Sequence, residues 1–195
     1  MEGLYALKPW YTRRLQRFVR SAVDHGRSPD LFTLVGVLGA AAAGLTLAVG
    51  WWWAAVPLLA LRLAGANLDG AVARARGVSR PWGFVLNELG DRASDLLMFA
   101  GLAWWAAQHS TGHLVWVLVA AVAATLPTFA SLSAAGAGAT RRNGGPLGKT
   151  ERCALVVLGC AVPSWLPVVC GVIVLGSLVT AGLRLREAHR ELVSA

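Results

Sequence analysis

Residues 31–61 read LFTLVGVLGAAAAGLTLAVGWWWAAVPLLAL and contain no Asp, Glu, Lys or Arg. A membrane-spanning helix needs about 20 apolar residues, so this run is too long for one helix. The stretch GWWWAAVP at residues 50–57 interrupts the run near its middle. The run therefore predicts two antiparallel helices joined by a short turn. Gly36, Ala40 and Gly44 form a stripe of small residues on the first helix, which we expect to pack against another helix.

Two further uncharged runs follow the same pattern. Residues 96–140 are interrupted by QHSTGH at 108–113, and residues 153–183 by PSWLP at 163–167. Each run is again too long for a single span. We therefore expect an all-α integral membrane protein with six transmembrane helices, at about residues 30–50, 54–77, 82–107, 114–140, 147–163 and 166–185.

The composition supports a membrane protein and excludes several other classes. Hydrophobic residues make up 56% of the chain and charged residues only 14%, with a mean hydropathy of +0.56. Soluble domains carry roughly 25% charged residues, so an ordinary soluble enzyme is not expected. The apolar content excludes disorder. The three cysteines are widely spaced in apolar sequence, which excludes a disulfide scaffold.

The net charge of +8 is explained by the placement of the basic residues. They gather before the first span, in the turns between spans two and three and between spans four and five, and after the last span. The hairpin tips on the other side contain no Lys or Arg. The positive-inside rule then places both termini on the cytoplasmic side of the inner (cytoplasmic) membrane. We therefore expect no nucleic-acid partner.

The first 27 residues precede the expected bundle, which spans residues 28–190. Residues 5–25 predict an amphipathic interfacial helix, because apolar side chains can share one broad face beside basic ones. A solvated cytoplasmic arm is the alternative. The whole chain, residues 1–195, is expected to form a single membrane domain. The apolar residues of the predicted helix are Leu7, Trp10, Tyr11, Leu15, Phe18 and Val19.

Ionisable residues inside the second and third spans are the most informative feature of the sequence. An ionisable group in a span costs about 2.5–3.5 kcal/mol on insertion scales, and such groups mark functional sites. Asn87, Asp91 and Asp95 recur every fourth residue and share one helix face. A short turn between the two spans would bring Asp69 level with Asn87 and Asp91. The full set is Arg62, Asp69, Arg74, Glu88, Asp91, Arg92 and Asp95.

Carboxylates gathered in one pocket repel each other, and a hard divalent cation with oxygen ligands relieves that repulsion. The spacing therefore predicts a Mg²⁺ or Mn²⁺ site formed by Asp69, Asn87, Asp91 and Asp95. The alternative is a set of charge pairs, in which Arg62 pairs with Asp69 and Arg74 or Arg92 pairs with Asp91 or Asp95.

The residues of this hairpin resemble a known signature. Asp69-Gly70, Ala73-Arg74, Gly83, Asn87 and Asp91 stand at the spacing of the motif of the CDP-alcohol phosphotransferase family. The family has Asp at two positions that are Ala66 and Asn87 here. The segments NELGD at 87–91 and GPLGKT at 145–150 resemble a divergent branch of that family.

This resemblance implies a fold, a reaction and a partner set. Family members have six membrane helices and cytoplasmic termini, and they are commonly homodimers. They take part in phospholipid biosynthesis by moving a phosphatidyl-type group from a CDP-linked lipid donor to an alcohol, with release of CMP. CDP-diacylglycerol is the donor that we expect for this chain.

The resemblance also implies a role for each matching residue. Asp91 becomes the catalytic base, and it shares the metal with Asp69 and Asn87. Arg74 becomes a contact of the donor phosphates, and the small residues Gly70, Ala73 and Gly83 leave room for the nucleotide. Independently of the resemblance, Arg141, Arg142 and Lys149 form a basic cytoplasmic rim that suits an acceptor such as a phosphorylated alcohol or an anionic headgroup. Membrane topology alone equally explains their charge.

The two departures from the motif change the expected metal content. Four carboxylates can balance two divalent cations, whereas Asp69 and Asp91 supply two negative charges and the amide of Asn87 none. We therefore predict one firmly bound divalent cation, with a second cation bound weakly or not at all. The alternative function is a catalytically impaired family member that binds nucleotide, lipid or a partner protein.

Overall fold

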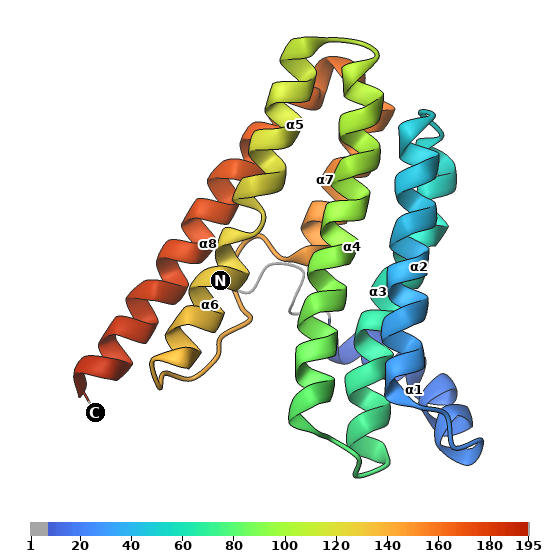
Figure 1. Ribbon diagram of the computed structural model, residues 1–195, viewed down its shortest axis with the longest axis vertical. Coiled ribbons are helices and arrows are strands. Elements are labelled where there is room, and N and C mark those ends of the chain that lie inside the picture. Colours follow the sequence, from blue (N-terminus) through green and yellow to red (C-terminus); the bar gives the residue numbers. More distant parts are fainter. Residues whose placement is uncertain (1–7, 195) are drawn as a thin grey trace. The chain divides into compact units, whose positions relative to one another are not determined.

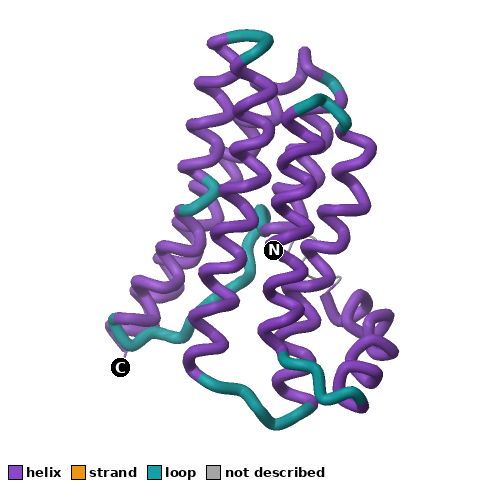
Figure 2. Tube along the Cα trace, turned by 45° about the vertical axis from the view of Figure 1, so that its right-hand side comes forward, coloured by secondary structure: helices purple, strands orange, loops and turns teal. Residues whose placement is uncertain are grey.

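The computed structural model describes residues 8–194, and every regular element in this part of the chain is a helix (Figures 1 and 2). The prediction of an all-α protein is confirmed. The elements are α1 (Lys8–Asp24), α2 (Pro29–Ala48), α3 (Trp52–Ala75), α4 (Pro81–Ala107), α5 (Thr111–Ala123), α6 (Leu126–Gly136), α7 (Lys149–Ala161), a short 3-10 helix (Pro163–Trp165) and α8 (Leu166–Ser194).

Four helical stretches of the described chain are long and apolar enough to cross a membrane. They are Pro29–Ala48, Trp52–Ala75, Thr111–Gly136 and Pro163–Ser194. The third and fifth predicted spans coincide with α4 and α7. Helix α4 is long enough to cross but carries charged residues, and α7 has only 13 residues. Residues 5–7 of the predicted interfacial helix lie outside the described residues, and its remaining part forms α1.

The chain divides into two compact units, an N-terminal unit (residues 7–105) and a C-terminal unit (residues 106 onward). In the N-terminal unit, α2 and α3 run side by side as the predicted hairpin (Figure 1). A Cβ atom placed on Gly36 would lie 3.2 Å from the carbonyl oxygen of Arg62, and one on Gly39 would lie 3.1 Å from that of Leu58. The small residues of α2 therefore allow its close approach to the backbone of α3, as the sequence predicts.

Helix α4 crosses α2 at a second pair of glycines. A Cβ atom on Gly44 would lie 2.5 Å from the carbonyl oxygen of Leu97, and one on Gly101 would overlap the carbonyl oxygen of Gly44. We expect Gly101→Ala to destabilise the protein by about 1–3 kcal/mol, because an added methyl group must push the two helices apart. The melting temperature of the purified protein in detergent measures this change.

Gly171→Ala is the matched control for that substitution. A Cβ atom on Gly171, in α8, meets no heavy atom within 4 Å. Alanine in an open helix position stabilises by roughly 0.5–1 kcal/mol relative to glycine. The melting temperature should therefore stay constant or rise for Gly171→Ala, and an equal fall for both variants would contradict the close crossing.

In the C-terminal unit, α8 packs against α5, α6 and α7. The predicted span at about residues 114–140 coincides with the apolar stretch Thr111–Gly136, which the structure divides into α5 and α6. Pro127 lies in the first turn of α6, where its missing N–H and its ring prevent α5 from continuing. The last helix also runs beyond the predicted limit of residue 185 and ends at Ser194.

Candidate functional site

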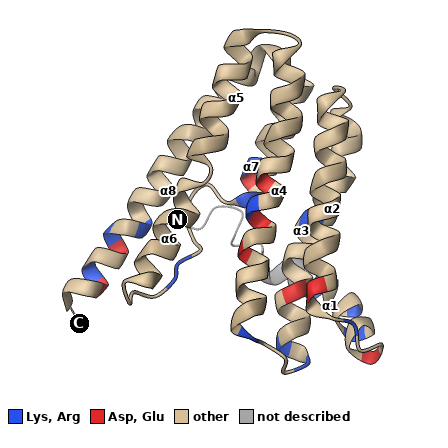
Figure 3. Ribbon diagram, viewed as in Figure 1, with Lys and Arg blue, Asp and Glu red and all other residues tan. Residues whose placement is uncertain are grey.

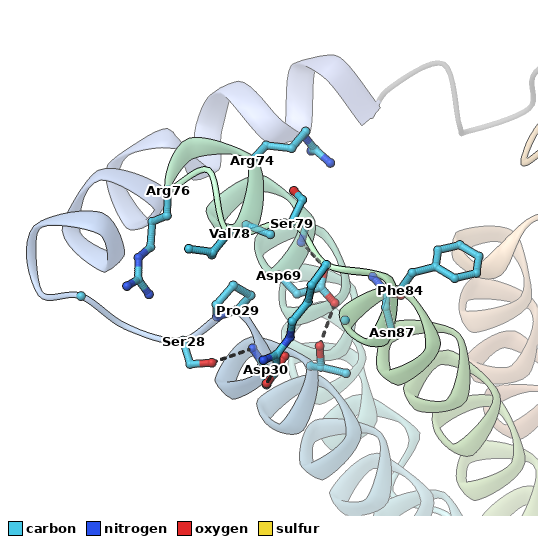
Figure 4. A pocket seen from close by; sticks show the side chains of 16 residues that line it. Ser28, Pro29, Asp30, Asp69, Arg74, Arg76, Val78, Ser79, Phe84 and Asn87 are labelled. Carbon is cyan, nitrogen blue, oxygen red and sulfur yellow. Dashed lines mark hydrogen bonds and ion pairs between the residues drawn. The ribbon is translucent and has the colours of Figure 1, made fainter.

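A cavity of about 590 Å³ lies in the N-terminal unit, where the start of α2, the end of α3 and the start of α4 meet (Figure 4). Charged residues of this unit gather toward the cavity, and the half that carries the turn between α2 and α3 has none (Figure 3). The lining residues are Gly26, Ser28, Pro29, Asp30, Thr33, Asp69, Gly70, Ala73, Arg74, Arg76, Val78, Ser79, Arg80, Gly83, Phe84 and Asn87.

Helix capping and two long-range contacts form the mouth of this large cavity. Ser28 caps α2, because its side-chain oxygen accepts a hydrogen bond of 3.3 Å from the backbone N–H of Asp30. Asp30 in turn pairs with Arg80. Arg76 donates a hydrogen bond of 2.6 Å to the carbonyl oxygen of Arg27. These contacts connect the turn between α3 and α4 to the first turn of α2 and to the segment before it. The sequence alone did not reveal them.

Asp69 forms part of the cavity floor and is held in one orientation. Its side chain is buried, one oxygen accepts a hydrogen bond of 3.0 Å from the hydroxyl of Thr33, and the other accepts one of 2.5 Å from the backbone N–H of Gly70. Asn87 lines the same cavity from α4 (Figure 4). A fixed carboxylate and an amide oxygen are suitable ligands for a hard cation.

A second, much smaller cavity of about 10 Å³ adjoins this floor. Asp69 and Asn87 line both cavities, whereas Asp91 lines only the small one. The structure therefore brings together three of the four residues predicted to bind metal. The lining residues of the small cavity are Thr33, Gly36, Arg62, Ala66, Asp69, Asn87, Gly90, Asp91 and Ser94.

Asp95, the fourth residue, lies in a charge cluster instead. It is 3% exposed, with one carboxylate oxygen 2.5 Å from Nη2 of Arg62 and the other 3.1 Å from Nη2 of Arg92. It lines neither cavity. The charge-pair alternative with Arg92 therefore describes Asp95, and we leave it out of the proposed metal ligands. Its pairing with Arg62 was not foreseen from the sequence.

The remaining oxygen ligands fit one Mg²⁺ or Mn²⁺ ion by their chemistry. Asp69 and Asp91 offer carboxylate oxygens and Asn87 an amide oxygen around one small cavity. Among the residues that the structure describes, no group of three or more His, Cys, Asp or Glu side chains could hold a metal ion. A cation at this cavity therefore depends on the amide, on hydroxyl groups or on substrate oxygens to complete its coordination.

The predicted donor contacts also line the large cavity. Gly70, Ala73, Arg74 and Gly83 all belong to its wall. A Cβ atom on Gly70 would lie 3.1 Å from Nη1 of Arg74, so glycine leaves room for the arginine side chain. Arg74, Arg76 and Arg80 give this wall a positive charge.

The predicted acceptor residues lie in the C-terminal unit, around the loop between α6 and α7. Arg142 forms ion pairs with Glu187 at 3.3 Å and with Glu191 at 3.0 Å, and Lys149 begins α7. Arg141 and Arg142 stand in the loop itself. None of the three predicted acceptor residues lines the two cavities described above.

Arg184 of α8 holds this loop through backbone atoms, a role that the sequence did not reveal. It donates hydrogen bonds to the carbonyl oxygens of Pro127 (2.7 Å), Asn143 (2.8 Å) and Gly144 (2.9 Å). Gly145 has a φ of +141°, and a Cβ atom there would overlap the side chain of Thr180. The GPLGKT segment therefore includes a glycine that the packing against α8 requires.

The model of CDP-alcohol phosphatidyltransferases matches residues 27–183, so the chain belongs to this family. Phosphatidylinositol phosphate synthase from Mycolicibacterium smegmatis is 33% identical over 167 residues, which cover 83% of this chain and 74% of that protein.

The relationship extends to solved structures. Phosphatidylinositol phosphate synthase from Mycobacterium tuberculosis with CDP-DAG bound is similar with a TM-score of 0.78 and 28% identity, covering 90% of this chain and 94% of that one. The same enzyme in complex with manganese and citrate is similar with a TM-score of 0.76 and 28% identity, covering 89% and 88%. The family identified from the sequence motif is confirmed, and with it a membrane protein of a metal-binding transferase family in phospholipid biosynthesis.

Proposed function

We propose that this protein is a membrane-embedded transferase that moves a phosphatidyl-type group from a CDP-linked lipid, CDP-diacylglycerol, to an alcohol and releases CMP. The observation that carries the proposal is the pair of adjoining cavities that share Asp69 and Asn87 as lining residues. The similarity to a synthase with CDP-DAG bound supports the choice of donor.

The large cavity suits the nucleotide part of the donor. Its volume of about 590 Å³ lies within the usual range of roughly 300–1,000 Å³ for small-molecule sites. Arg74, Arg76 and Arg80 line it, and guanidinium groups bind phosphate oxygens through paired hydrogen bonds. We assign the diphosphate to the side of the cavity near Arg74 and Gly70.

Asp69, Asn87 and Asp91 would hold one Mg²⁺ or Mn²⁺ ion. When bound, such an ion supplies positive charge that stabilises the phosphate oxygens during transfer. The hydroxyl of Thr33 fixes the orientation of Asp69 through its hydrogen bond of 3.0 Å. A similar enzyme was solved in complex with manganese, which supports a divalent cation here.

Asp91 is the proposed general base. It is only partly buried and follows Asn87 by one turn of α4 at the small cavity. Its carboxylate accepts the proton of the acceptor hydroxyl as that oxygen forms a bond to phosphorus. The bond between this phosphorus and the CMP oxygen breaks, and CMP leaves with the bonding electron pair.

The acceptor is proposed to be an alcohol that carries a phosphate group. Relatives of this chain are phosphatidylinositol phosphate synthases, and Arg141, Arg142 and Lys149 provide basic side chains near the loop before α7. The choice of a phosphorylated acceptor is tested by comparing CMP release with a phosphorylated alcohol and with the same alcohol without its phosphate group.

The proposed topology has six spans with both termini on the cytoplasmic face of the inner membrane. Helices α4 and α7 supply the two spans beyond the four apolar stretches. The family model covers parts of both units, which supports one domain over residues 1–195. Exposed Arg13, Arg14, Arg17 and Arg20 on α1 support an interfacial helix that contacts lipid headgroups.

The test of this proposal is CMP release by the purified protein in lipid. CDP-diacylglycerol, Mn²⁺ or Mg²⁺ and pooled alcohols, free and phosphorylated, are supplied together. We expect CMP release that needs both an acceptor and the cation and that stops when a chelator removes the cation. Release that is equally fast without an acceptor would indicate hydrolysis and would contradict a transferase.

A binding protein without turnover is the second candidate. Ala66 and Asn87 lack carboxylates, and Asp95 is engaged with two arginines, which leaves few ligands for a catalytic cation. Tight binding of CDP-diacylglycerol with no CMP release from a broad acceptor pool would favour this alternative.

A further inference from the structure

Arg62 is the largest completely buried side chain in the described chain, with 0% of its surface exposed. It lies in the middle of α3, on a helix long and apolar enough to cross a membrane. A charge at such a depth is costly, and it marks a functional group more often than a packing group. The role that this buried cation plays is therefore open to inference from its surroundings.

Asp95 holds the guanidinium group of Arg62 in place. The distance between Nη2 of Arg62 and Oδ1 of Asp95 is 2.5 Å, and both side chains are buried. Arg92 binds the other oxygen of Asp95 at 3.1 Å. Two guanidinium groups thus share one carboxylate.

The closely packed backbone of α2 further restricts the position of Arg62. A Cβ atom on Gly65 would lie 2.5 Å from the carbonyl oxygen of Phe32, and one on Gly36 would lie 3.2 Å from the carbonyl oxygen of Arg62 itself. The two helix backbones therefore approach each other beside Arg62. With its backbone packed against α2 and its guanidinium group paired with Asp95, Arg62 offers a fixed positive charge.

Arg62 lines the small cavity together with Asp69 and Asp91. These are its ionisable lining residues, and two carboxylates with one guanidinium leave a single net negative charge. The volume of about 10 Å³ is close to the least space that one water molecule needs, roughly 10–15 Å³. Both the charge and the space match one small cation.

We propose that Arg62 is a built-in cation of the active site, positioned by Asp95, that takes the place of a second divalent cation. Its guanidinium group offsets part of the charge of Asp69 and Asp91 and limits the small cavity to one metal ion. Arg62 is thus a positioning and charge-setting residue for the metal. This inference rests on the proposed metal-dependent function.

Ala66 offers a position at which a second metal site can be introduced by substitution. It follows Arg62 by one turn of α3 and lines the same cavity. A carboxylate introduced at residue 66 would add a ligand beside Asp69. As long as Arg62 is present, its positive charge opposes a second cation at that ligand, and its removal lifts this opposition.

The experiment is a Mn²⁺ titration, by calorimetry and by electron paramagnetic resonance, of the full-length protein in detergent. The variants are Ala66→Asp, Arg62→Met/Asp95→Asn, and the two combined. We expect one Mn²⁺ per chain in the parent, in Ala66→Asp and in the variant without the ion pair. The combined variant should bind two, with spin coupling between them. Arg62→Lys/Ala66→Asp is the control that keeps the positive charge, and it should bind one.

Several outcomes would overturn the proposal. Two tightly bound ions in the parent or in Ala66→Asp would show that Arg62 does not limit the site, and this result needs no change at Arg62. One ion in the combined variant, with its melting temperature close to that of the parent, would do the same. A parent that binds no Mn²⁺ would overturn both this inference and the metal site of the proposed function. One ion in the parent and one in a combined variant that melts close to the parent would overturn this inference and leave the metal site of the proposed function in place.

Discussion

Asp91→Asn is expected to lower the rate of CMP release by about a thousandfold, in the middle of the range for loss of a general base. The amide has the shape of the carboxylate but cannot take up the proton of the acceptor hydroxyl. Asp91 is partly buried at the small cavity, so bulk water replaces it poorly. The measurement is the initial rate of CMP release from CDP-diacylglycerol at saturating acceptor.

Glu88→Gln is the matched control, because it removes one carboxylate from the same helix. Glu88 is partly buried and lines neither cavity, so the rate of CMP release by Glu88→Gln should stay within about twofold of the parent's rate. Rates are compared at saturating Mn²⁺, since Asp91 is also a proposed metal ligand. A tenfold or smaller loss for Asp91→Asn, or an equal loss for both variants, would assign the base to another group.

The helices of this protein were largely predictable because the lipid bilayer imposes a length on uncharged sequence. The interruption at residues 50–57 marks the turn between α2 and α3, and the one at 108–113 marks the turn before α5. The division between α5 and α6 was not predicted, because Pro127 lies in an apolar run with no charged residue nearby. Hydropathy does not register a proline, whereas its missing N–H ends the helix.

The candidate site was predictable where it depends on local helix geometry. Asn87 and Asp91 share a face of α4, and the short turn after α3 brings Asp69 to the same level. The same periodicity wrongly placed Asp95 at the metal site, because residues on one helix face at different heights along the helix meet different neighbours. One turn beyond Asp91, the residue that faces α4 from α3 is Arg62 rather than another oxygen ligand.

Contacts made by backbone atoms were beyond the reach of the sequence. Arg184 was assigned only a topological role as a basic residue after the last span. In the structure it donates hydrogen bonds to one carbonyl oxygen in the first turn of α6 and to two in the loop after α6. No side-chain pattern indicates this arrangement, since every residue has a carbonyl group.

Arg62→Met is expected to destabilise the protein by about 3–5 kcal/mol, the usual result of removing one partner from a buried ion pair. Asp95 is 3% exposed and would lose its contact of 2.5 Å with Arg62, while its contact with Arg92 is longer, at 3.1 Å. For a chain of this length the loss corresponds to a fall in melting temperature of roughly 6–20 °C, which differential scanning calorimetry in detergent measures.

Two further variants separate the charge of Arg62 from its bulk. Arg62→Met/Asp95→Asn removes both charges, and because neutral replacements of a buried pair are often tolerated, most of the stability should return. Arg92→Met removes the partly exposed partner of Asp95 and should cost less than about 1 kcal/mol.

If the double variant were as unstable as Arg62→Met, the packing of the long side chain would be the stabilising feature. An Arg92→Met variant as unstable as Arg62→Met would instead show that the two guanidinium groups hold Asp95 equally. The predicted order, with Arg62→Met far below the other two, requires that the pair of 2.5 Å with Arg62, rather than the pair of 3.1 Å with Arg92, stabilises the charge of Asp95 between α3 and α4.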